Sequence, residues 1–294
     1  MWQGLLEKIF WNKLKERVFL AKRIGIDKLS FNIPKEKGYL ILPKESMQSE
    51  IDGVIVETDK IVEKYIHSNK HQDIFLTRHG KKTKQHFDSL LLRKSLDNLT
   101  PESPFIKLAL HPELIECISE YLGQIPRLNT IEIWYSRYIE NPKSSTLFHT
   151  DTEYSKQAKL FIYGSDVLDD NSGPFNLYDR ENSKKAMKHF NYQSNKSIDT
   201  HNLRKYLGGN NLISIRGYKG TAFLADTCNI FHSGSLVKDK SSWRITIMFQ
   251  YLPYLSYKKW YDFSHLIKPN HSKIQKLVLD SKGVGHSLFK GNLY

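Results

Sequence analysis

The stretch 148-FHTDTEY-154 lies between two runs of strand-forming residues, 131-IEIWYSRYI-139 and 158-AKLFIYG-164. In a β-strand, residues i and i+2 point to the same face, so an extended backbone here aims His149 and Asp151 at one point. An imidazole and a carboxylate on one face suit a divalent first-row metal. Two interpretations stay open: a metal site, and a turn in which the aspartate caps a short helix.

Downstream of this stretch, short strand-like runs alternate with turns rich in Gly, Asn and Asp. Several short strands joined by loops are typical of a β-sandwich or a small barrel. The later runs are 212-LISI-215, 220-GTAFLAD-226 and 243-WRITIMFQYL-252.

A third candidate metal ligand is His232, in 226-DTCNIFHSGS-235, which follows one of these strand-like runs. Two histidines and one carboxylate on one face of a metal leave its other coordination positions open. That ligand set is the facial triad of non-haem Fe(II) oxygenases.

Twelve residues after His232, Arg244 begins the run 244-RITIMFQY-251. Alternation puts Arg244, Thr246 and Met248 on one face and leaves the other face apolar, suited to packing on helices. An arginine inside a barrel needs an anion, and a guanidinium binds a carboxylate through two parallel hydrogen bonds. The pattern predicts a site for a dicarboxylate whose other end chelates the metal, with an intramolecular salt bridge or a solvated strand end as the alternatives.

The order of these motifs resembles the phytanoyl-CoA dioxygenase family over about residues 105–252. The resemblance implies a mostly β chain with flanking helices and a double-stranded β-helix core. It also implies Fe(II) held by His149, Asp151 and His232, and 2-oxoglutarate held by Arg244 with help from Ser235. Some members carry that serine two residues after the histidine, where this chain has Gly234. The matching pieces are 149-HTD-151, 170-DNSGPF-175, 217-GYKGT-221, 226-DTCNIFHSGS-235 and Arg244.

The resemblance implies a dioxygenase that hydroxylates a small or medium-sized metabolite and releases succinate and CO2. A non-catalytic protein of the same fold that binds a metal or a ligand is the alternative. A hydrolase is disfavoured because the chain has no G-x-S-x-G motif. Tyr135, Arg137 and Tyr163 are expected to line the pocket, and Arg137 is a second candidate for the anion partner.

We expect three regions: a mainly helical N-terminal extension (1–104), the β-helix core (105–255) and a C-terminal tail packed on the core (256–294). The first helix is basic and amphipathic; packing on its own domain or on a partner is favoured over contact with a membrane surface. Helices are predicted at 4–23, 85–99, 112–123, within 179–195 and near 272–279.

Composition excludes several classes of protein. A hydrophobic content of 39% is too high for a disordered chain, and without a run of about 18 apolar residues we expect no transmembrane helix. The two cysteines, far apart in sequence, fit a reducing cytosol and a cytoplasmic location. The net charge of +13 comes from scattered Lys and Arg, so nucleic-acid binding is disfavoured and a small, anionic substrate is favoured.

Overall fold

Two antiparallel sheets face each other in the computed structural model, which describes residues 2–24, 31–67, 89–91, 99–138, 146–152, 154–194, 196–256 and 261–281. Within these residues the large sheet has six strands in the order β1-β7-β4-β9-β3-β2, and the small sheet has three in the order β6-β5-β8. The strands are β1 (Tyr39–Ile41), β2 (Ser89–Leu91), β3 (Arg127–Arg137), β4 (Ala158–Tyr163), β5 (Phe175–Leu177), β6 (Ile213–Ile215), β7 (Ala222–Ala225), β8 (His232–Gly234) and β9 (Trp243–Leu252).

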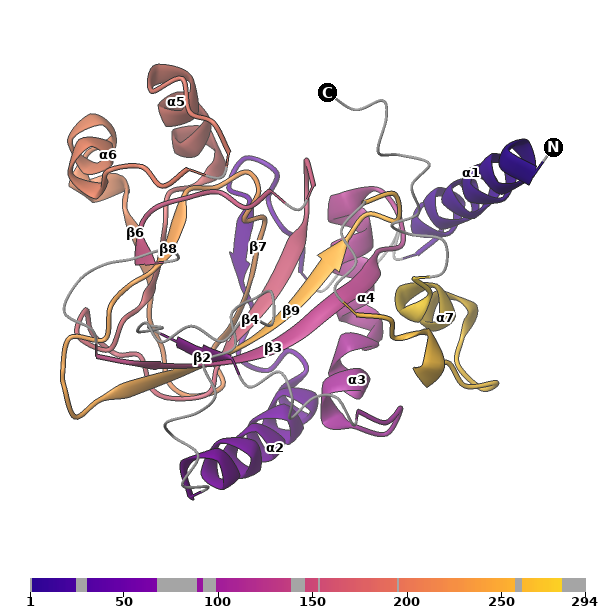
Figure 1. The fold of residues 1–294 in the computed structure, drawn as a ribbon, viewed down its shortest axis with the longest axis horizontal. Helices are drawn as coiled ribbons and strands as arrows, with labels where there is room; N and C mark the ends of the chain where they lie inside the picture. Colours follow the sequence, from indigo (N-terminus) through magenta and orange to yellow (C-terminus); the bar gives the residue numbers. More distant parts are fainter. Residues whose placement is uncertain are drawn as a thin grey trace.

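From β3 onward the chain passes back and forth between the two sheets. β3, β4, β7 and β9 belong to the large sheet, while β5, β6 and β8 belong to the small one. Between β3 and β4, His149 bridges to His232 of β8, which brings that segment to the edge of the small sheet. This path is the predicted double-stranded β-helix, and the prediction of a mostly β chain with flanking helices is confirmed (Figure 1).

The outer face of the large sheet is apolar and packs against helices. On β9, Ile245, Ile247 and Phe249 are buried in one core cluster with residues of α2 (Gln48–His67), α3 (Pro104–Ala109), α4 (Pro112–Leu122) and α7 (Lys273–Leu279). Arg244, Thr246 and Met248 alternate with them and face the small sheet, as the sequence pattern predicts. Beside this sheet lie α2, α3 and α4 (Figure 1).

Aromatic rings fill part of the space between the sheets. Phe161 lies 4.9 Å from Phe175 and 5.1 Å from Phe223, measured between ring centroids. The Tyr163 hydroxyl donates to the carbonyl of Ile215 at 2.7 Å and accepts from the Phe175 backbone N–H at 3.0 Å. Because Tyr163 belongs to the large sheet and its partners to the small one, these bonds fix the spacing of the sheets.

A helical insertion covers the small sheet between β5 and β6. It contains α5 (Arg180–His189), α6 (Thr200–Leu207) and the 3₁₀ turn η3 (Gly209–Asn211), and Figure 1 shows both helices above that sheet. The side chain of Asp179 caps α5 and that of Asp199 caps α6. The helix predicted within 179–195 is therefore confirmed over the range of α5.

Two further helix predictions are confirmed and one is wrong. α4 begins at Pro112 and ends before Gly123, whose φ of 72° forms a left-handed C-cap. α7 (Lys273–Leu279) begins with a capping box of Ser272 and Gln275. Residues 89–91, inside the helix predicted at 85–99, instead form β2, because pairing with β3 overrides the local preference. The rest of that predicted helix, apart from Leu99, lies outside the described residues.

The first hundred residues also contribute to the β core. β1 pairs with β7 at one edge of the large sheet, and β2 pairs with β3 at the other. The predicted N-terminal extension thus supplies both edge strands of this sheet as well as helices. None of the helices in the described part of the chain is long and apolar enough to cross a bilayer.

Helix α1 (Trp2–Ala21) is held to the core by a buried guanidinium. Arg17 is fully buried and donates to the carbonyl groups of Ile125, Pro126, Leu277 and Asp280 at 2.6 to 3.1 Å. Burial lowers the pKa of Arg17 to about 10. One side chain therefore joins α1 to the start of β3 and to α7, as the prediction of packing on its own domain requires.

Replacing Arg17 tests this anchor. Arg17→Ala removes the guanidinium that donates to four carbonyl groups, so we expect the free energy of unfolding to fall by about 3 kcal/mol. Urea unfolding followed by circular dichroism measures the change. The matched control is Lys15→Ala, because Lys15 is exposed on the same helix. Equal stability of the two variants would contradict the anchoring role.

Candidate metal centre

Backbone pairing places two histidines side by side. His149 donates its N–H to the carbonyl of His232 at 3.1 Å, and His232 donates back to His149 at 3.0 Å. Residues that exchange both hydrogen bonds across an antiparallel pair present their side chains on the same face. The two imidazole centroids accordingly lie 4.3 Å apart.

Asp151 completes a cluster of three candidate ligands. Its backbone N–H donates to the carbonyl of Thr227 at 2.8 Å, which keeps the segment after His149 beside the turn that precedes β8. Oδ1 of Asp151 lies 3.9 Å from Nε2 of His149, and Oδ2 lies 3.9 Å from Nε2 of His232. The ligand atoms of the three residues all lie within 4.8 Å of one another. Because bonds from a first-row metal to nitrogen or oxygen are about 2.1 Å long, one ion can reach all three residues with small adjustments.

Both imidazoles are oriented for metal binding. Nδ1 of His149 lies 2.8 Å from the carbonyl of Leu147, and Nδ1 of His232 lies 3.2 Å from the carbonyl of Ile230. A carbonyl accepts from an Nδ1–H, which leaves the Nε2 lone pair free for a cation. Burial lowers the pKa of His232 to about 3, so this ring is neutral at physiological pH.

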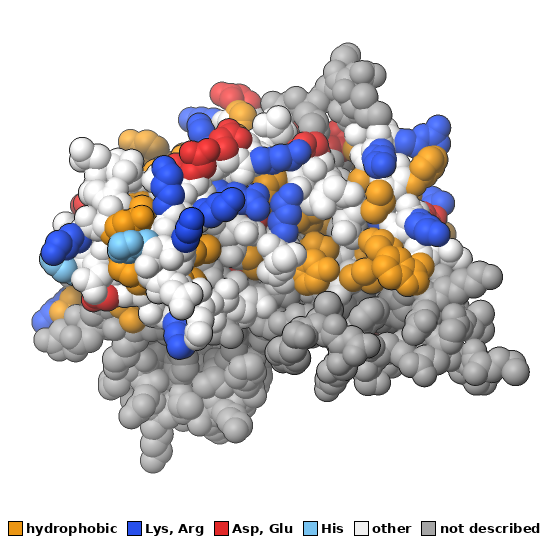
Figure 2. All heavy atoms as spheres, turned by 90° about the horizontal axis from the view of Figure 1, so that it is seen from above, with side chains coloured by type: hydrophobic (Ala, Val, Ile, Leu, Met, Phe, Trp, Pro, Cys, Tyr) orange, Lys and Arg blue, Asp and Glu red, His pale blue; other side chains and the backbone are white. Residues whose placement is uncertain are grey.

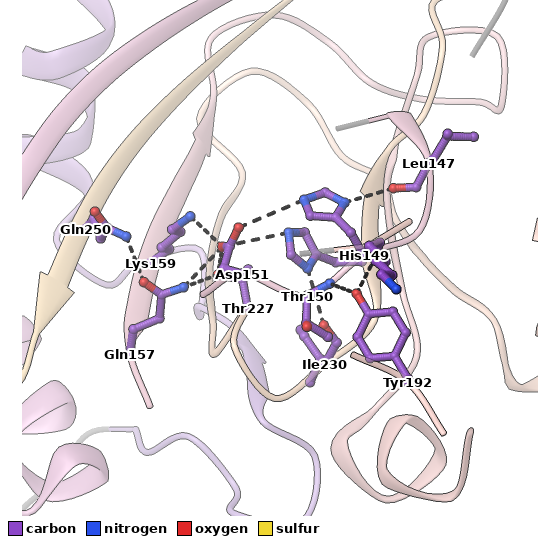
Figure 3. Close-up of polar contacts among 12 residues, drawn as sticks. Leu147, His149, Thr150, Asp151, Gln157, Lys159, Tyr192, Thr227, Ile230 and Gln250 are labelled. Carbon is purple, nitrogen blue, oxygen red and sulfur yellow. Dashed lines mark hydrogen bonds and ion pairs between the residues drawn. The ribbon is translucent and has the colours of Figure 1, made fainter. Parts of the chain in front are cut away.

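One oxygen of Asp151 is occupied by hydrogen bonds. Oδ2 accepts from Nζ of Lys159 at 2.6 Å, from Oγ1 of Thr227 at 2.5 Å and from Nε2 of Gln157 at 3.1 Å (Figure 3). Among the described residues no hydrogen bond to Oδ1 is found. The carboxylate is thus held by Oδ2 and presents Oδ1 as its available ligand atom.

The charge on Asp151 is secured by its neighbours. Burial by itself favours the protonated acid, but the charge of the Lys159 ammonium and its hydrogen bond outweigh burial and hold the pKa of Asp151 well below its usual range. Lys159 is 4% exposed and lies on β4, whose other inward side chains are aromatic. A buried ion pair therefore forms part of the cluster.

A chain of hydrogen-bonded side chains runs from Arg127, the first residue of β3, through three amides to this carboxylate. Arg127 donates to Asn129, Asn129 to Gln250, and Gln250 to Gln157, each at 2.7 Å. Gln157 then donates to Asp151. Every link points the same way, from a buried cation towards a buried carboxylate, so each amide has a single orientation that satisfies its neighbours.

A second buried carboxylate supports the turn that carries Thr227. Asp226 accepts from the Tyr121 hydroxyl at 2.7 Å, from the Asn229 amide at 2.9 Å and from the Gln157 backbone N–H at 3.1 Å. Burial raises the pKa of Asp226. This residue fixes both Thr227 and Gln157, the two neutral donors to Asp151, and has no contact with the two histidines in the described hydrogen-bond network.

Arg244 is a buried cation surrounded by neutral groups. Its Nη1 donates to the carbonyl groups of Gly173 and Ser235, and its Nη2 donates to Oγ of Ser136 at 3.3 Å. Its Nε is buried and has no hydrogen-bond partner among the residues that the structure describes. Burial lowers its pKa. The alternative of an intramolecular salt bridge is not observed for Arg244 among the described residues.

Gly173 is required next to this guanidinium. Its φ of 75° is in the left-handed region, and a Cβ there would lie 2.9 Å from the carbonyl oxygen of Ser235 and 3.1 Å from Nη1 of Arg244. The glycine therefore allows the backbone to approach the arginine closely.

Two residues predicted to line the pocket lie on the other face of the large sheet. In the register of β3 and β9, Ser136 pairs with Arg244 and shares its inward face, so Tyr135 and Arg137 point outward. Tyr135 is 4% exposed within the helix-covered core and stacks on Trp243, with centroids 5.8 Å apart. Arg137 is exposed, with its guanidinium 5.1 Å from the Tyr135 ring centre, and does not reach the interior.

The two other predicted residues contact the interior differently. Tyr163 lies between the sheets, but its hydroxyl is already bonded to β5 and β6. Ser235 contacts Arg244 through its carbonyl group, while its hydroxyl accepts from the Asn176 amide at 2.6 Å. Alternation from the inward-facing His232 turns the Ser235 side chain to the outer face of the small sheet, away from the expected cosubstrate.

The donors to Asp151 were missed in the sequence, although a signal exists for two of the residues in this network. Lys159 is a charged residue in the otherwise apolar strand β4, and Gln250 is a polar residue near the apolar end of β9; each shares a face with residues that point between the sheets. Gln157 and Thr227 lie just outside strands, where no periodicity marks them.

Comparison with known proteins supports the fold. No family model matches the sequence, and no curated protein matches it. The solved structure of the non-heme alpha ketoglutarate dependent carbocyclase SnoK from nogalamycin biosynthesis is similar, with a TM-score of 0.50 and 15% identity, covering 79% of this chain and 85% of that one. EctD from S. alaskensis with 2-oxoglutarate and 5-hydroxyectoine gives a TM-score of 0.50 and 13% identity, covering 75% and 74%. EctD with bound Fe gives a TM-score of 0.50 and 11% identity, covering 75% and 74%. At identities this low, the similarity shows a shared fold.

The amide chain predicts an effect on metal affinity. Gln157→Leu removes one donor to Asp151 and leaves the Gln250 amide without its acceptor, so we expect affinity for Co(II), a stable stand-in for Fe(II), to fall 10- to 100-fold. Titration followed by visible absorption measures it. Gln193→Leu, at an exposed position, is the matched control. A folded Gln157→Leu protein that binds Co(II) as tightly as the control would contradict a role of Gln157 in metal binding.

Proposed function

We propose that this chain is an Fe(II)- and 2-oxoglutarate-dependent oxygenase that acts on a small or medium-sized metabolite. The observation that carries the proposal is a His149–Asp151–His232 cluster between the two sheets, together with Arg244, a buried cation without an anionic partner among the described residues. The shared fold supports it, because EctD, which is similar in fold, has been solved with 2-oxoglutarate and with bound Fe.

The metal would be held by Nε2 of His149, Nε2 of His232 and Oδ1 of Asp151. Because the hydrogen bonds on Oδ2 favour coordination through a single carboxylate oxygen, three protein ligands leave room for the cosubstrate and O2. Bound iron with 2-oxoglutarate supplies the oxidising chemistry, releasing succinate and CO2. The protein residues hold the ligands, neutralise charge and orient the cosubstrate.

Lys159 sets the charge of this centre. Its ammonium lies 2.6 Å from Asp151, and the two charges cancel. As metal ligands both imidazoles would be neutral, so a bound divalent cation would keep nearly its full double charge, which attracts a dianionic 2-oxo acid. This accounts for a lysine beside a metal ligand, where a cation would otherwise oppose metal binding.

Arg244 would bind the distal carboxylate of 2-oxoglutarate. Its buried Nε–H is free to donate, and a carboxylate would supply the negative charge that Gly173, Ser136 and Ser235 lack. We assign no role to the Ser235 hydroxyl in this contact.

Membership of the phytanoyl-CoA dioxygenase family, hydroxylation as the reaction, a cytoplasmic location and the three-region division stay predictions.

Arg244→Gln separates cosubstrate binding from metal binding. The variant removes the positive charge but not the metal ligands, so 2-oxoglutarate affinity should fall at least 100-fold while Co(II) affinity changes less than threefold. Calorimetry on the Co(II)-loaded protein measures both steps. Arg216→Gln, at an exposed ion pair with Asp170, is the matched control. Unchanged 2-oxoglutarate affinity in Arg244→Gln would show that the distal carboxylate binds elsewhere in the protein.

Turnover tests the function itself. We expect Fe(II)- and 2-oxoglutarate-dependent succinate formation by the wild type, even without an identified substrate. His149→Ala should reduce this rate at least 100-fold, because it removes a ligand from the proposed centre. His201→Ala, an exposed histidine on α6, is the control. Tight binding of Fe(II) and 2-oxoglutarate without any succinate would instead favour a non-catalytic binding protein.

A further inference from the structure

A cavity of about 430 Å³ lies on the outer face of the small sheet. Its floor includes Asn176 of β5, Ser214 of β6 and Ser233 of β8, and Thr200 and Arg204 of α6 line the opposite side. The volume is within the range of small-molecule sites, roughly 300 to 1,000 Å³. None of the three proposed metal ligands lines it.

The cavity and the metal centre lie on opposite faces of the same sheet. On β8, His232 faces the interior, so the next residue, Ser233, faces outward. Asn176 pairs with both Ser233 and Ser214 across the sheet, which puts the three side chains on one face. Their strand neighbours Phe175 and Ile215 point inward to the aromatic core. The outer face thus carries a row of polar groups beneath a helix, where apolar residues would be expected.

These polar groups retain hydrogen-bonding capacity. Asn176 donates to Oγ of Ser235 at 2.6 Å and accepts from Oγ of Ser214 at 2.7 Å. Ser235 therefore still has its own O–H to donate. Ser233 is 3% exposed, lines the cavity, and makes no side-chain hydrogen bond in the described part of the chain. Two hydroxyl donors are thus available to a molecule inside.

The charges around the cavity favour an anion. Arg204 and Lys238 line it, and both are exposed and have no ion-pair partner among the described residues. The acidic residue that lines it, Asp170, is paired with Arg216 at 2.7 Å. Figure 2, seen from above Figure 1 and so from the side of α5 and α6, shows Lys and Arg side chains spread across this face, with Asp and Glu side chains among them.

We propose that this cavity is a second binding site, for an anionic small molecule rich in hydroxyl groups, such as a phosphorylated sugar. The serine and asparagine row would bind the hydroxyl groups, and Arg204 with Lys238 would bind the phosphate. Phe148, also in the lining, offers an apolar surface for the ring of a sugar. The site does not depend on the proposed oxygenase function, because it uses none of the same side chains.

Calorimetry on the chelator-treated full-length protein tests the site, with glucose 6-phosphate, inorganic phosphate and uncharged glucose as probes. We expect glucose 6-phosphate to bind more tightly than inorganic phosphate, and glucose to bind weakest. Arg204→Gln and Lys238→Gln should each weaken glucose 6-phosphate binding about tenfold, the loss of one charge-assisted contact. Ser233→Ala, which removes an available hydroxyl donor, should weaken the binding of glucose 6-phosphate but not that of inorganic phosphate.

Two control variants locate the binding. Lys205→Gln changes an exposed charge on the same helix that does not line the cavity, and should bind like the wild type. Arg244→Gln reports on binding between the sheets, where this guanidinium lies; it is not a neutral variant, because Arg244 also contacts the Ser235 carbonyl. Absence of binding by either phosphate probe would overturn the proposal, as would binding that survives Arg204→Gln and Lys238→Gln but is lost in Arg244→Gln. Failure of succinate formation leaves this result unaffected.

Discussion

The hydrogen bonds on Oδ2 of Asp151 are the constraint on which the candidate centre depends. A buried carboxylate between two histidines is costly unless its charge is neutralised and its lone pairs are bonded. Lys159, Thr227 and Gln157 meet both needs on one oxygen. They leave the other oxygen available, so the same contacts that stabilise the carboxylate also determine how it can bind a metal.

The two-sheet fold supplies these groups from different strands. Lys159 comes from β4, Thr227 from the turn before β8, and Gln157 is held by Gln250 of β9. The bridge between His149 and His232 brings the remaining two ligands together through backbone pairing alone. Because no local segment can form the cluster, the centre exists only when both sheets are assembled. The buried ion pair and the amide chain are therefore a property of the whole core.

Sequence alternation predicted much of this arrangement. The inward position of Arg244 and the apolar outer face of β9 follow from the period of two in that strand. The same rule, applied to β3, would have excluded Tyr135 and Arg137 from the pocket. Alternation puts them on the same face of the strand as Ile131 and Ile133, which pack on helices. Strands of three residues, such as β1 and β2, are too short to show a period, and only their partners define them. The contacts of Gln157 arise from packing between distant strands, which no local pattern encodes.

The most direct test of the central claim is a crystal structure of the protein prepared without oxygen in the presence of Fe(II) and 2-oxoglutarate. The account predicts iron bound to Nε2 of His149, Nε2 of His232 and Oδ1 of Asp151, with Oδ2 still bonded to Lys159 and the distal carboxylate of 2-oxoglutarate against Arg244. Iron bound elsewhere, or 2-oxoglutarate held without Arg244, would contradict it.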